Sequence, residues 1–214
     1  MKIIVHSFVI SLFLFLLAPG IQAQGQWVPF EKGGKWGYRD TQGKVAIKPK
    51  FILAQNFSPE GIAAVIDTAG WGYINRRGAV IIRPFVFDNG PDPFQEGLAR
   101  FTKKDKFGFF DRTGKVVITP KFDFAAPFHE GLAAFCTGCE KNMIGEHSFW
   151  EGGKWGYINR QGNIAIAAQF DSVKDFEKGK AQVTHEGKLI YIDNKGMPMP
   201  DAQEKIVPPG KDQK

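Results

Sequence analysis

The chain has 214 residues, of which 43% are hydrophobic and 23% charged, so a collagen-like fibre and a chain without a folded core are both excluded. The formal net charge of +6 comes from Lys and Arg interleaved with Asp and Glu, without a run of like charges, so a nucleic-acid-binding stripe is not indicated. The 20 Phe, 5 Trp and 25 Gly favour a β-rich fold in which aromatic rings fill layers and glycines make turns.

The first 23 residues have the organisation of a secretory signal peptide. Lys2 precedes an uncharged stretch from Ile3 to Ala18, and small residues near Ala23 offer a cleavage site. An uncleaved membrane anchor is the alternative, but a span needs about 20 apolar residues and Pro19 follows too soon. We therefore expect residues 1–23 to be removed. The mature chain is then exported, to the periplasm or outside the cell, with no transmembrane segment.

An internal repeat occupies most of the chain after the signal peptide. The six residues Lys35–Asp40 return four times, and the Trp-type positions are spaced by 35, 36, 48 and 34 residues. The Trp-type residues are Trp36, Trp71, Phe107, Trp155 and Leu189. A glycine follows the first four directly, at Gly37, Gly72, Gly108 and Gly156, and another stands seven residues after each of the five, at Gly43, Gly78, Gly114, Gly162 and Gly196.

Each repeat predicts three short strands. An Asp or Asn, two polar residues and the second glycine are typical of a type I turn closed by a left-handed glycine, which joins two strands into a hairpin. The strand after the turn alternates apolar residues, as at Val45 and Ile47, and we expect the prolines at Pro49, Pro84 and Pro120 to end its pairing. A Glu-Gly pair, as at Glu96 and Glu130, then turns the chain into a third strand.

The repeat also makes predictions about the core and the ends of the array. Because each repeat must bury one face against its neighbour, we expect Trp36, Trp71 and Trp155 to fill the layers between repeats. Pro198 and Pro200 fall where earlier repeats have apolar strand residues, which suits a terminal cap. Residues 201–214 are expected to form a flexible tail.

The predicted fold class is all-β, with tandem three-stranded β-hairpin repeats of about 35 residues stacked as an open twisted array. A propeller-like closed ring is the alternative. The repeat domain is expected to span residues 24–200 and to hold about four and a half repeats.

Lys-Trp-Gly-Tyr-Ile-Asn, with a glycine seven residues after the Trp and an Ile-x-Pro-x-Phe-Asp segment, resembles the WG-repeat, or KWG-repeat, family of bacterial proteins. The resemblance covers about Trp27 to Gly196. Phe107 in place of Trp, Leu189-Ile190 in place of Trp-Gly, and Ala168 in place of Pro depart from the pattern. The resemblance implies a β-hairpin repeat architecture and a binding or interaction role. It carries over no catalytic residues.

Residues 136–153 lengthen one repeat by about 14 residues and contain both cysteines of the chain, Cys136 and Cys139. We expect an irregular loop here, projecting from the scaffold, with a local disulfide formed after export. A thiol-redox centre is an alternative, although no helix signal follows the pair. A metal site that recruits His147, Glu146 or His129 is another, although secure zinc motifs have a second ligand pair.

No other chemistry is indicated by the sequence. None of the mature serines lies in a nucleophile elbow, no histidines are paired at metal spacing, and no phosphate-cradling loop is present. We therefore expect a non-enzymatic exported repeat protein that binds another protein or a cell-envelope component, with no cofactor, no metal and no nucleic acid. No binding residues are assigned. The alternative is an envelope thiol-redox or metal-binding protein that acts through Cys136 and Cys139.

Overall fold

The computed structural model describes residues 26–145 and 147–199. The predicted signal peptide (1–23) and the predicted tail (201–214) lie outside these residues. The described residues form strands and turns and contain no helix, and thus none long and apolar enough to cross a membrane. The predicted all-β class is confirmed.

The strands pair into five antiparallel sheets that follow one another along the chain, here called sheets 1 to 5. Sheet 1 contains β1 (Val28–Lys32), β2 (Lys35–Arg39) and β3 (Val45–Phe51). Sheet 2 contains β4 (Leu53–Ala54), β5 (Ala63–Asp67), β6 (Gly70–Ile74) and β7 (Val80–Ile82). Sheet 3 contains β10 (Leu98–Lys103), β11 (Lys106–Asp111) and β12 (Val116–Phe122).

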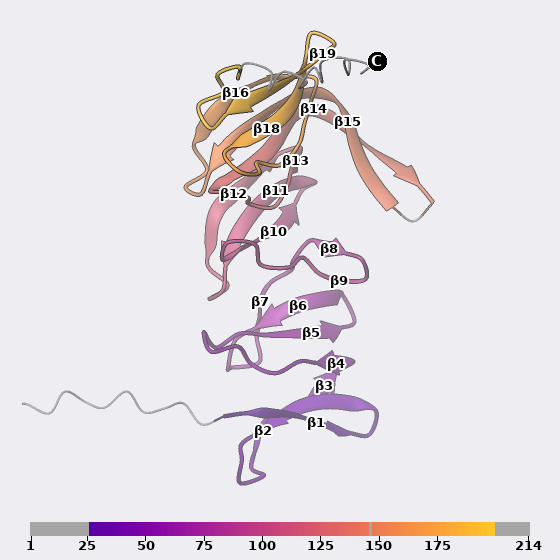
Figure 1. Ribbon diagram of the computed structural model, residues 1–214. Coiled ribbons are helices and arrows are strands. Elements are labelled where there is room, and N and C mark those ends of the chain that lie inside the picture. Colours follow the sequence, from indigo (N-terminus) through magenta and orange to yellow (C-terminus); the bar gives the residue numbers. More distant parts are fainter. Residues whose placement is uncertain (1–25, 146, 200–214) are drawn as a thin grey trace, which may run out of the picture.

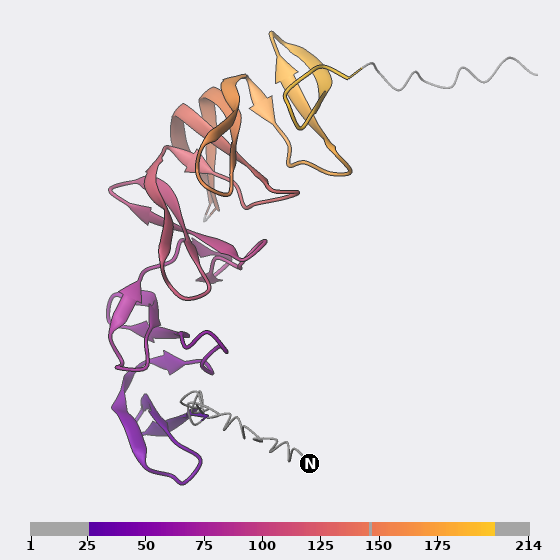
Figure 2. The ribbon, with the colours of Figure 1, turned by 90° about the vertical axis from the view of Figure 1, so that its left-hand side faces the viewer.

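Sheet 4 contains β13 (Phe124–Ala125), β14 (Leu132–Ile144), β15 (His147–Asn159) and β16 (Ile164–Phe170). Sheet 5 contains β17 (Ser172–Val173), β18 (Lys180–His185) and β19 (Lys188–Asp193). A small two-stranded ribbon, β8 (Val86–Phe87) and β9 (Gly90–Pro91), precedes sheet 3. Figures 1 and 2 show the sheets in chain order along a curved axis, with sheets 1 and 5 at opposite ends. The described part of the chain is thus the predicted open array and not a ring.

The hairpin turns have the predicted geometry. In sheet 1 the Gly43 N–H donates to the Asp40 carbonyl (3.1 Å) and the Asp40 N–H donates to the Lys44 carbonyl (3.0 Å). The Asp40 carboxylate also accepts from the backbone of Gln42 and Lys44. The glycine at this place in all five sheets has a φ between 73° and 86°, a left-handed conformation that other residues adopt only with strain. The repeated Asx-x-x-Gly pattern therefore fixes where each hairpin turns.

The glycine after the Trp is required by a close approach of two strands. A Cβ on Gly37 would lie 2.4 Å from the Ile47 carbonyl oxygen and 2.7 Å from the Pro49 nitrogen. The third strand bulges here, because Tyr38 pairs with Ile47 whereas Trp36 pairs with Phe51. Gly108 and Gly156 meet the bulges of their own sheets in the same way. The bulge leaves no room for a side chain on the facing residue.

The prediction that proline ends the pairing of this strand is wrong for two of the three prolines. Pro49 and Pro120 lie inside β3 and β12, and each strand resumes pairing two residues later. Proline fits because the bulged residue needs no N–H in the ladder. Pro84 and Pro198 lie in isolated bridges, to Phe101 and Ile192 respectively, and Pro200 lies outside the described residues.

Tyrosine, rather than tryptophan, fills the layers between sheets. Trp36, Trp71 and Trp155 are only half-buried, whereas Tyr38 and Tyr157, two residues further along the same strands, are fully buried. Burial raises the pKa of both phenols. The expectation that the tryptophans form the layers is therefore wrong, because the next sheet covers the tyrosine end of the strand.

An aromatic ring from each of sheets 2 to 5 packs on the tyrosine position of the sheet before it. The ring centroids are 4.7 Å apart for Tyr38 and Phe57, 5.8 Å for Tyr73 and Phe94, 4.8 Å for Phe109 and Phe128, and 4.8 Å for Tyr157 and Phe176. The phenols of Tyr38 and Tyr157 also donate hydrogen bonds to backbone carbonyls of the next sheet, at Gln55 (2.8 Å) and Lys174 (2.6 Å). The same contact thus recurs at every junction.

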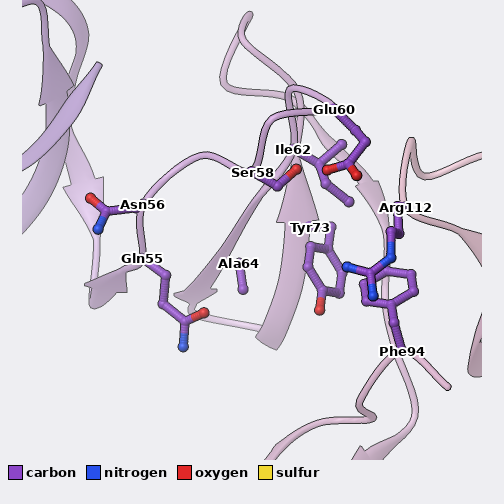
Figure 3. Close-up of a pocket in the computed structure, with 9 residues that line it drawn as sticks. All are labelled: Gln55, Asn56, Ser58, Glu60, Ile62, Ala64, Tyr73, Phe94 and Arg112. Carbon is purple, nitrogen blue, oxygen red and sulfur yellow. The ribbon is translucent and has the colours of Figure 1, made fainter. Parts of the chain in front are cut away.

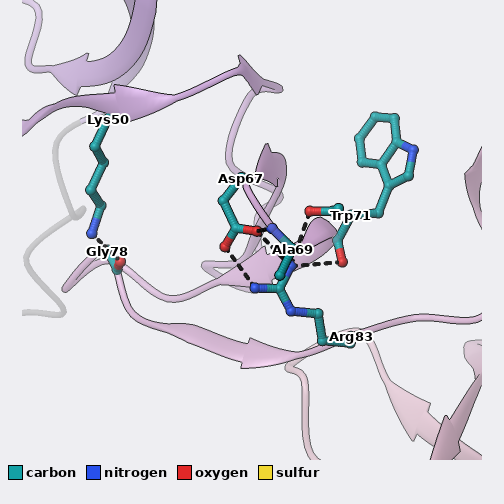
Figure 4. Close-up of polar contacts among 7 residues, drawn as sticks. Lys50, Asp67, Ala69, Trp71, Gly78 and Arg83 are labelled. Carbon is teal, nitrogen blue, oxygen red and sulfur yellow. Dashed lines mark hydrogen bonds and ion pairs between the residues drawn. The ribbon is translucent and has the colours of Figure 1, made fainter.

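Turns of neighbouring sheets also contact each other directly. Lys50 of sheet 1 donates to the Gly78 carbonyl of sheet 2 (2.9 Å; Figure 4). Gly78 itself lies close to the Ile47 side chain. The carboxylate of Glu96 accepts from the Gly131 N–H (3.0 Å), and that of Glu130 accepts from the Gly179 N–H (2.8 Å). The turn role predicted for the two glutamates is confirmed, since each caps the equivalent turn of the following sheet.

Sheet 2 has an Arg–Asp ion pair where sheets 3 and 4 have a Lys–Asp ion pair. In sheets 3 and 4 the Lys before the Trp position pairs with an Asp beyond the third strand, Lys106 with Asp123 and Lys154 with Asp171. Gly70 takes the place of this Lys in sheet 2, and Arg83 pairs with Asp67 instead (2.6 Å; Figure 4). The hydrogen bonds from Arg83 lower the pKa of Asp67. The β5–β6 turn is thereby tied to the end of sheet 2.

We predict that Gly156→Ala lowers the free energy of unfolding by about 3 kcal/mol, because the new Cβ would overlap the backbone of the bulge. Gly72→Ala is the matched control. Its Cβ would meet only side-chain atoms of Val80 and Arg83, at 3.0 and 3.2 Å, which can move. We expect a loss of about 1 kcal/mol for the control. Urea unfolding monitored by circular dichroism gives both values, and equal losses would contradict the steric explanation.

We also predict that Tyr38→Ala lowers the free energy of unfolding by about 4 kcal/mol, and Trp36→Ala by about half as much, because only the tyrosine is fully buried. The two substituted positions lie two residues apart in β2. Any effect of an alanine on the strand itself is therefore expected to be similar in both variants. Thermal and urea denaturation of both variants measure the difference. A larger loss of unfolding free energy for Trp36→Ala would show that the tryptophan, and not the tyrosine, fills the layer between the sheets.

Candidate functional site

The insertion is a regular β-ribbon, and the prediction of an irregular loop is wrong. β14 and β15 run beyond sheet 4 and pair with each other from Leu132 and Asn159 to Ile144 and His147. Figure 1 shows this ribbon projecting from the side of the array. The extra residues satisfy their backbone hydrogen bonds in the ladder of the ribbon, so the projection is an ordered element.

The ribbon begins at the place where other sheets make a tight turn. Sheet 1 turns between β1 and β2 with two adjacent left-handed residues, Gly33 and Gly34 (φ 62° and 72°). In sheet 4 the residues at the same places in the strand register are Gly138 and Gly153 (φ 73° and 62°), and residues 139–152 lie between them; Gly152 is also left-handed (φ 72°). A Cβ on Gly153 would lie 2.4 Å from the Thr137 carbonyl oxygen, so the two strands cross closely here. The insertion therefore splits a two-residue turn and preserves both of its halves.

The predicted disulfide between Cys136 and Cys139 is confirmed, with a Cα–Cα distance of 6.1 Å. It brackets Gly138 at the base of the ribbon. The Gly138 N–H donates to the Asp123 carboxylate (2.6 Å), which is also paired with Lys106. The hydrogen bond from Lys106 lowers the pKa of Asp123. The disulfide restrains the β14 backbone at the base of the ribbon, and the Asp123 carboxylate ties this base to the end of sheet 3.

The other residues proposed around the cysteines are not assembled with them in the described structure. Glu146 and the side chain of His147 lie outside the part of the chain that the structure describes. His129 has its Nε2 3.5 Å from Asp175 of sheet 5. Within residues 26–145 and 147–199, no three His, Cys, Asp or Glu side chains gather as a metal site.

Beside the ribbon lies a cavity of about 260 Å³, here called the aromatic pocket. Its lining comes from the β8–β9 region, sheet 3, the start of sheet 4 and the ribbon: Phe85, Phe87, Arg100, Phe124, Ser148, Phe149, Trp150 and Trp155. Trp150 packs on Phe124 and Phe107, with ring centroids 4.5 and 5.3 Å apart. The ribbon is thus held over the array by ring contacts.

Arg100, which lines the aromatic pocket, belongs to a buried ion pair. Arg100 is 5% exposed and Asp92 is 1% exposed. Arg100 donates to both carboxylate oxygens of Asp92, from Nη2 (2.6 Å) and Nε (3.0 Å), and from Nη1 to the Ala125 carbonyl (3.1 Å). Its guanidinium carbon lies 5.0 Å from the centre of the Phe85 ring. The charge is therefore balanced, and the pocket presents a cation stacked among rings.

Sequence reasoning found part of this pocket and missed the rest. The insertion contributes Ser148, Phe149 and Trp150, which lie in the segment singled out as irregular. Arg100 and Asp92 were missed. One signal could have found Arg100, which stands where Ala64 and Ala134 stand in the neighbouring repeats. A charged residue at a strand position that is apolar in the repeats on either side indicates a buried partner.

Comparison with known proteins supports the repeat. A family model described as "WG containing repeat" matches residues 36–66, 71–107, 107–138 and 155–188, which is more than half of the chain. No curated protein and no solved structure matches the chain.

We predict that the double variant Cys136→Ser, Cys139→Ser loses about 2 kcal/mol of unfolding free energy, because the cross-link no longer restricts the unfolded chain. Urea unfolding of oxidised wild type and of the variant measures the loss. Thiol titration of the unfolded wild-type protein, purified after secretion, is expected to find no free thiol. Two free thiols would contradict the assignment.

Proposed function

Because the chain belongs to the WG-repeat family, we propose that it is a non-enzymatic binding protein, exported from the cytoplasm, that holds a protein partner at the cell envelope or outside the cell. The signal-like residues 1–23 support export, and the family resemblance supports a binding role. The aromatic pocket is the observation that carries the proposal. It is an apolar hollow formed where an inserted ribbon meets a regular scaffold, the kind of place at which binding sites are often found.

The chemistry of the aromatic pocket favours an apolar side chain as the group that it receives. Phe87 is 54% exposed at its mouth, and Phe149 and Trp150 are half-exposed. The polar groups of Arg100 are committed to Asp92 and Ala125. A polar ligand buried here would lose its hydrogen bonds to water and regain few, at a cost in free energy. A leucine or aromatic side chain of a partner would lose none.

A pocket of this size accommodates one large side chain. Such single anchors, buried among aromatic residues and shielded from water, supply most of the affinity in many protein interfaces. Residues of the ribbon and of the β8–β9 region both line the pocket, so part of the surface around the anchor is formed by elements that depart from the repeat. We expect these elements to determine which partner binds.

Photo-crosslinking tests the proposal. A benzophenone amino acid in place of Phe149, in the mature chain incubated with the native envelope fraction, is expected to crosslink one main partner. Ile164 is the control position, since it is 53% exposed but lies on β16, outside the pocket. The same band from both positions, or none from Phe149, would contradict the proposal.

Trp150→Ala then measures the contribution of the pocket. We expect it to raise the dissociation constant for the identified partner by about 30-fold or more, because it removes the ring that forms a wall of the pocket. Trp36→Ala controls for the loss of a half-buried tryptophan in sheet 1, and is expected to leave the affinity unchanged. Calorimetric titration with the purified partner gives both values. Equal effects would show that the pocket is not the binding site.

A further inference from the structure

A second cavity, of about 170 Å³, lies at the junction of sheets 2 and 3 and is here called the polar pocket (Figure 3). It is lined by Gln55, Asn56, Ser58, Glu60, Ile62, Ala64, Tyr73, Phe94 and Arg112. None of these residues lines the aromatic pocket. The polar pocket combines amide, hydroxyl, carboxylate and guanidinium groups with two aromatic rings, so its chemistry differs from that of the proposed partner site.

The polar pocket exists because one junction of the array departs from the repeat. Tyr38 and Tyr157 each donate to the carbonyl of the residue seventeen positions later. For Tyr73 that residue is Gly90, in the β8–β9 ribbon, and the Tyr73 phenol makes no hydrogen bond with any described residue. Its ring still packs on Phe94, with centroids 5.8 Å apart. Unlike the phenols of Tyr38 and Tyr157, the Tyr73 phenol is thus left available to a ligand.

Opposite charges face each other at the rim of this pocket. The guanidinium carbon of Arg112 lies 5.2 Å from the centre of the Phe94 ring. The pKa of Glu60 is lowered, first by its own backbone N–H and also by the charge of Arg112. Glu60 therefore accepts hydrogen bonds as a carboxylate at neutral pH, while Arg112 donates them. Because the two charges balance, the pocket does not favour a ligand of either sign.

We propose that the polar pocket binds a single sugar ring. Neighbouring hydroxyls of a sugar both donate and accept hydrogen bonds. The Glu60 carboxylate accepts them, the Arg112 guanidinium donates them, and the Gln55 amide does both. The C–H face of the ring is apolar and can pack on an aromatic side chain such as Tyr73. The volume admits one ring and not a longer chain. A free monosaccharide and the terminal ring of a glycan offer this same chemistry.

NMR titration of the mature chain tests the proposal, with glucose, galactose, N-acetylglucosamine and a tetramer of N-acetylglucosamine as probes. We expect at least one probe to shift the Ala64 amide and the Gln55 side-chain amide. Tyr73→Phe is expected to raise the dissociation constant of that probe about fivefold, because one hydrogen bond is lost. Phe109 occupies the same repeat position in sheet 3, so the substitution suits the fold.

Tyr157→Phe is the matched control, since its phenol is bonded to the Lys174 carbonyl outside the polar pocket, and its loss is expected to leave sugar affinity within twofold. Tighter binding of the tetramer than of the monosaccharides identifies a glycan end, and equal binding identifies a free sugar; either supports the site. No shift at Ala64 or Gln55 with any probe at about 50 mM overturns the proposal, because a site with a Kd of about 1 mM would be saturated. Unchanged binding in both Tyr73→Phe and Glu60→Gln overturns it equally. Trp150→Ala should not affect this titration, so the two proposals fail independently.

Discussion

The aromatic ring pair at each junction is the contact on which the array depends. A sheet of three short strands buries too little surface to be stable alone, and it gains a core only when the next sheet covers it. The pairs of Tyr38 with Phe57 and of Tyr157 with Phe176 show how this is done at the two ends of the array. Such ring pairs add about 0.5–1.5 kcal/mol beyond the area that they bury. Each sheet is therefore stabilised mainly by its contacts with the sheets directly before and after it.

Dependence on nearest neighbours lets one sheet change without loss of the others. The inserted ribbon divides the turn between Gly138 and Gly153, and the strands beneath it keep the pairing of the repeat. The β8–β9 ribbon enters between sheets 2 and 3, and the Tyr73–Phe94 ring pair remains. The aromatic pocket is lined by residues of both departures, and the polar pocket lies at the junction of sheets 2 and 3, where the β8–β9 ribbon enters. Regular sheets thus supply rigidity, and the irregular segments supply the surfaces proposed to bind ligands.

Much of the fold could be predicted because the signals are local. An Asx residue and a left-handed glycine determine a turn within four residues, so five hairpins follow from the sequence alone. The disulfide was also predictable, since its two cysteines are three residues apart. Which of Trp36 and Tyr38 is fully buried between the sheets could not be predicted from the sequence. Alternation places both on one face of β2, and only the position of sheet 2 decides which of the two is covered.

The sequence by itself determined the repeat and the turns, because each of these depends on strands that are adjacent in the chain. The tertiary structure decided where the cavities lie. Arg100 lines a pocket together with Trp150 of the ribbon, about 50 residues further along, and no local sequence pattern predicts that arrangement. Tyr73 likewise has the same neighbours in sequence as Tyr157. The Tyr73 phenol has no hydrogen-bond partner among the described residues because the β8–β9 ribbon enters at its junction. Packing between segments that are distant in the chain is decided only by the folded array.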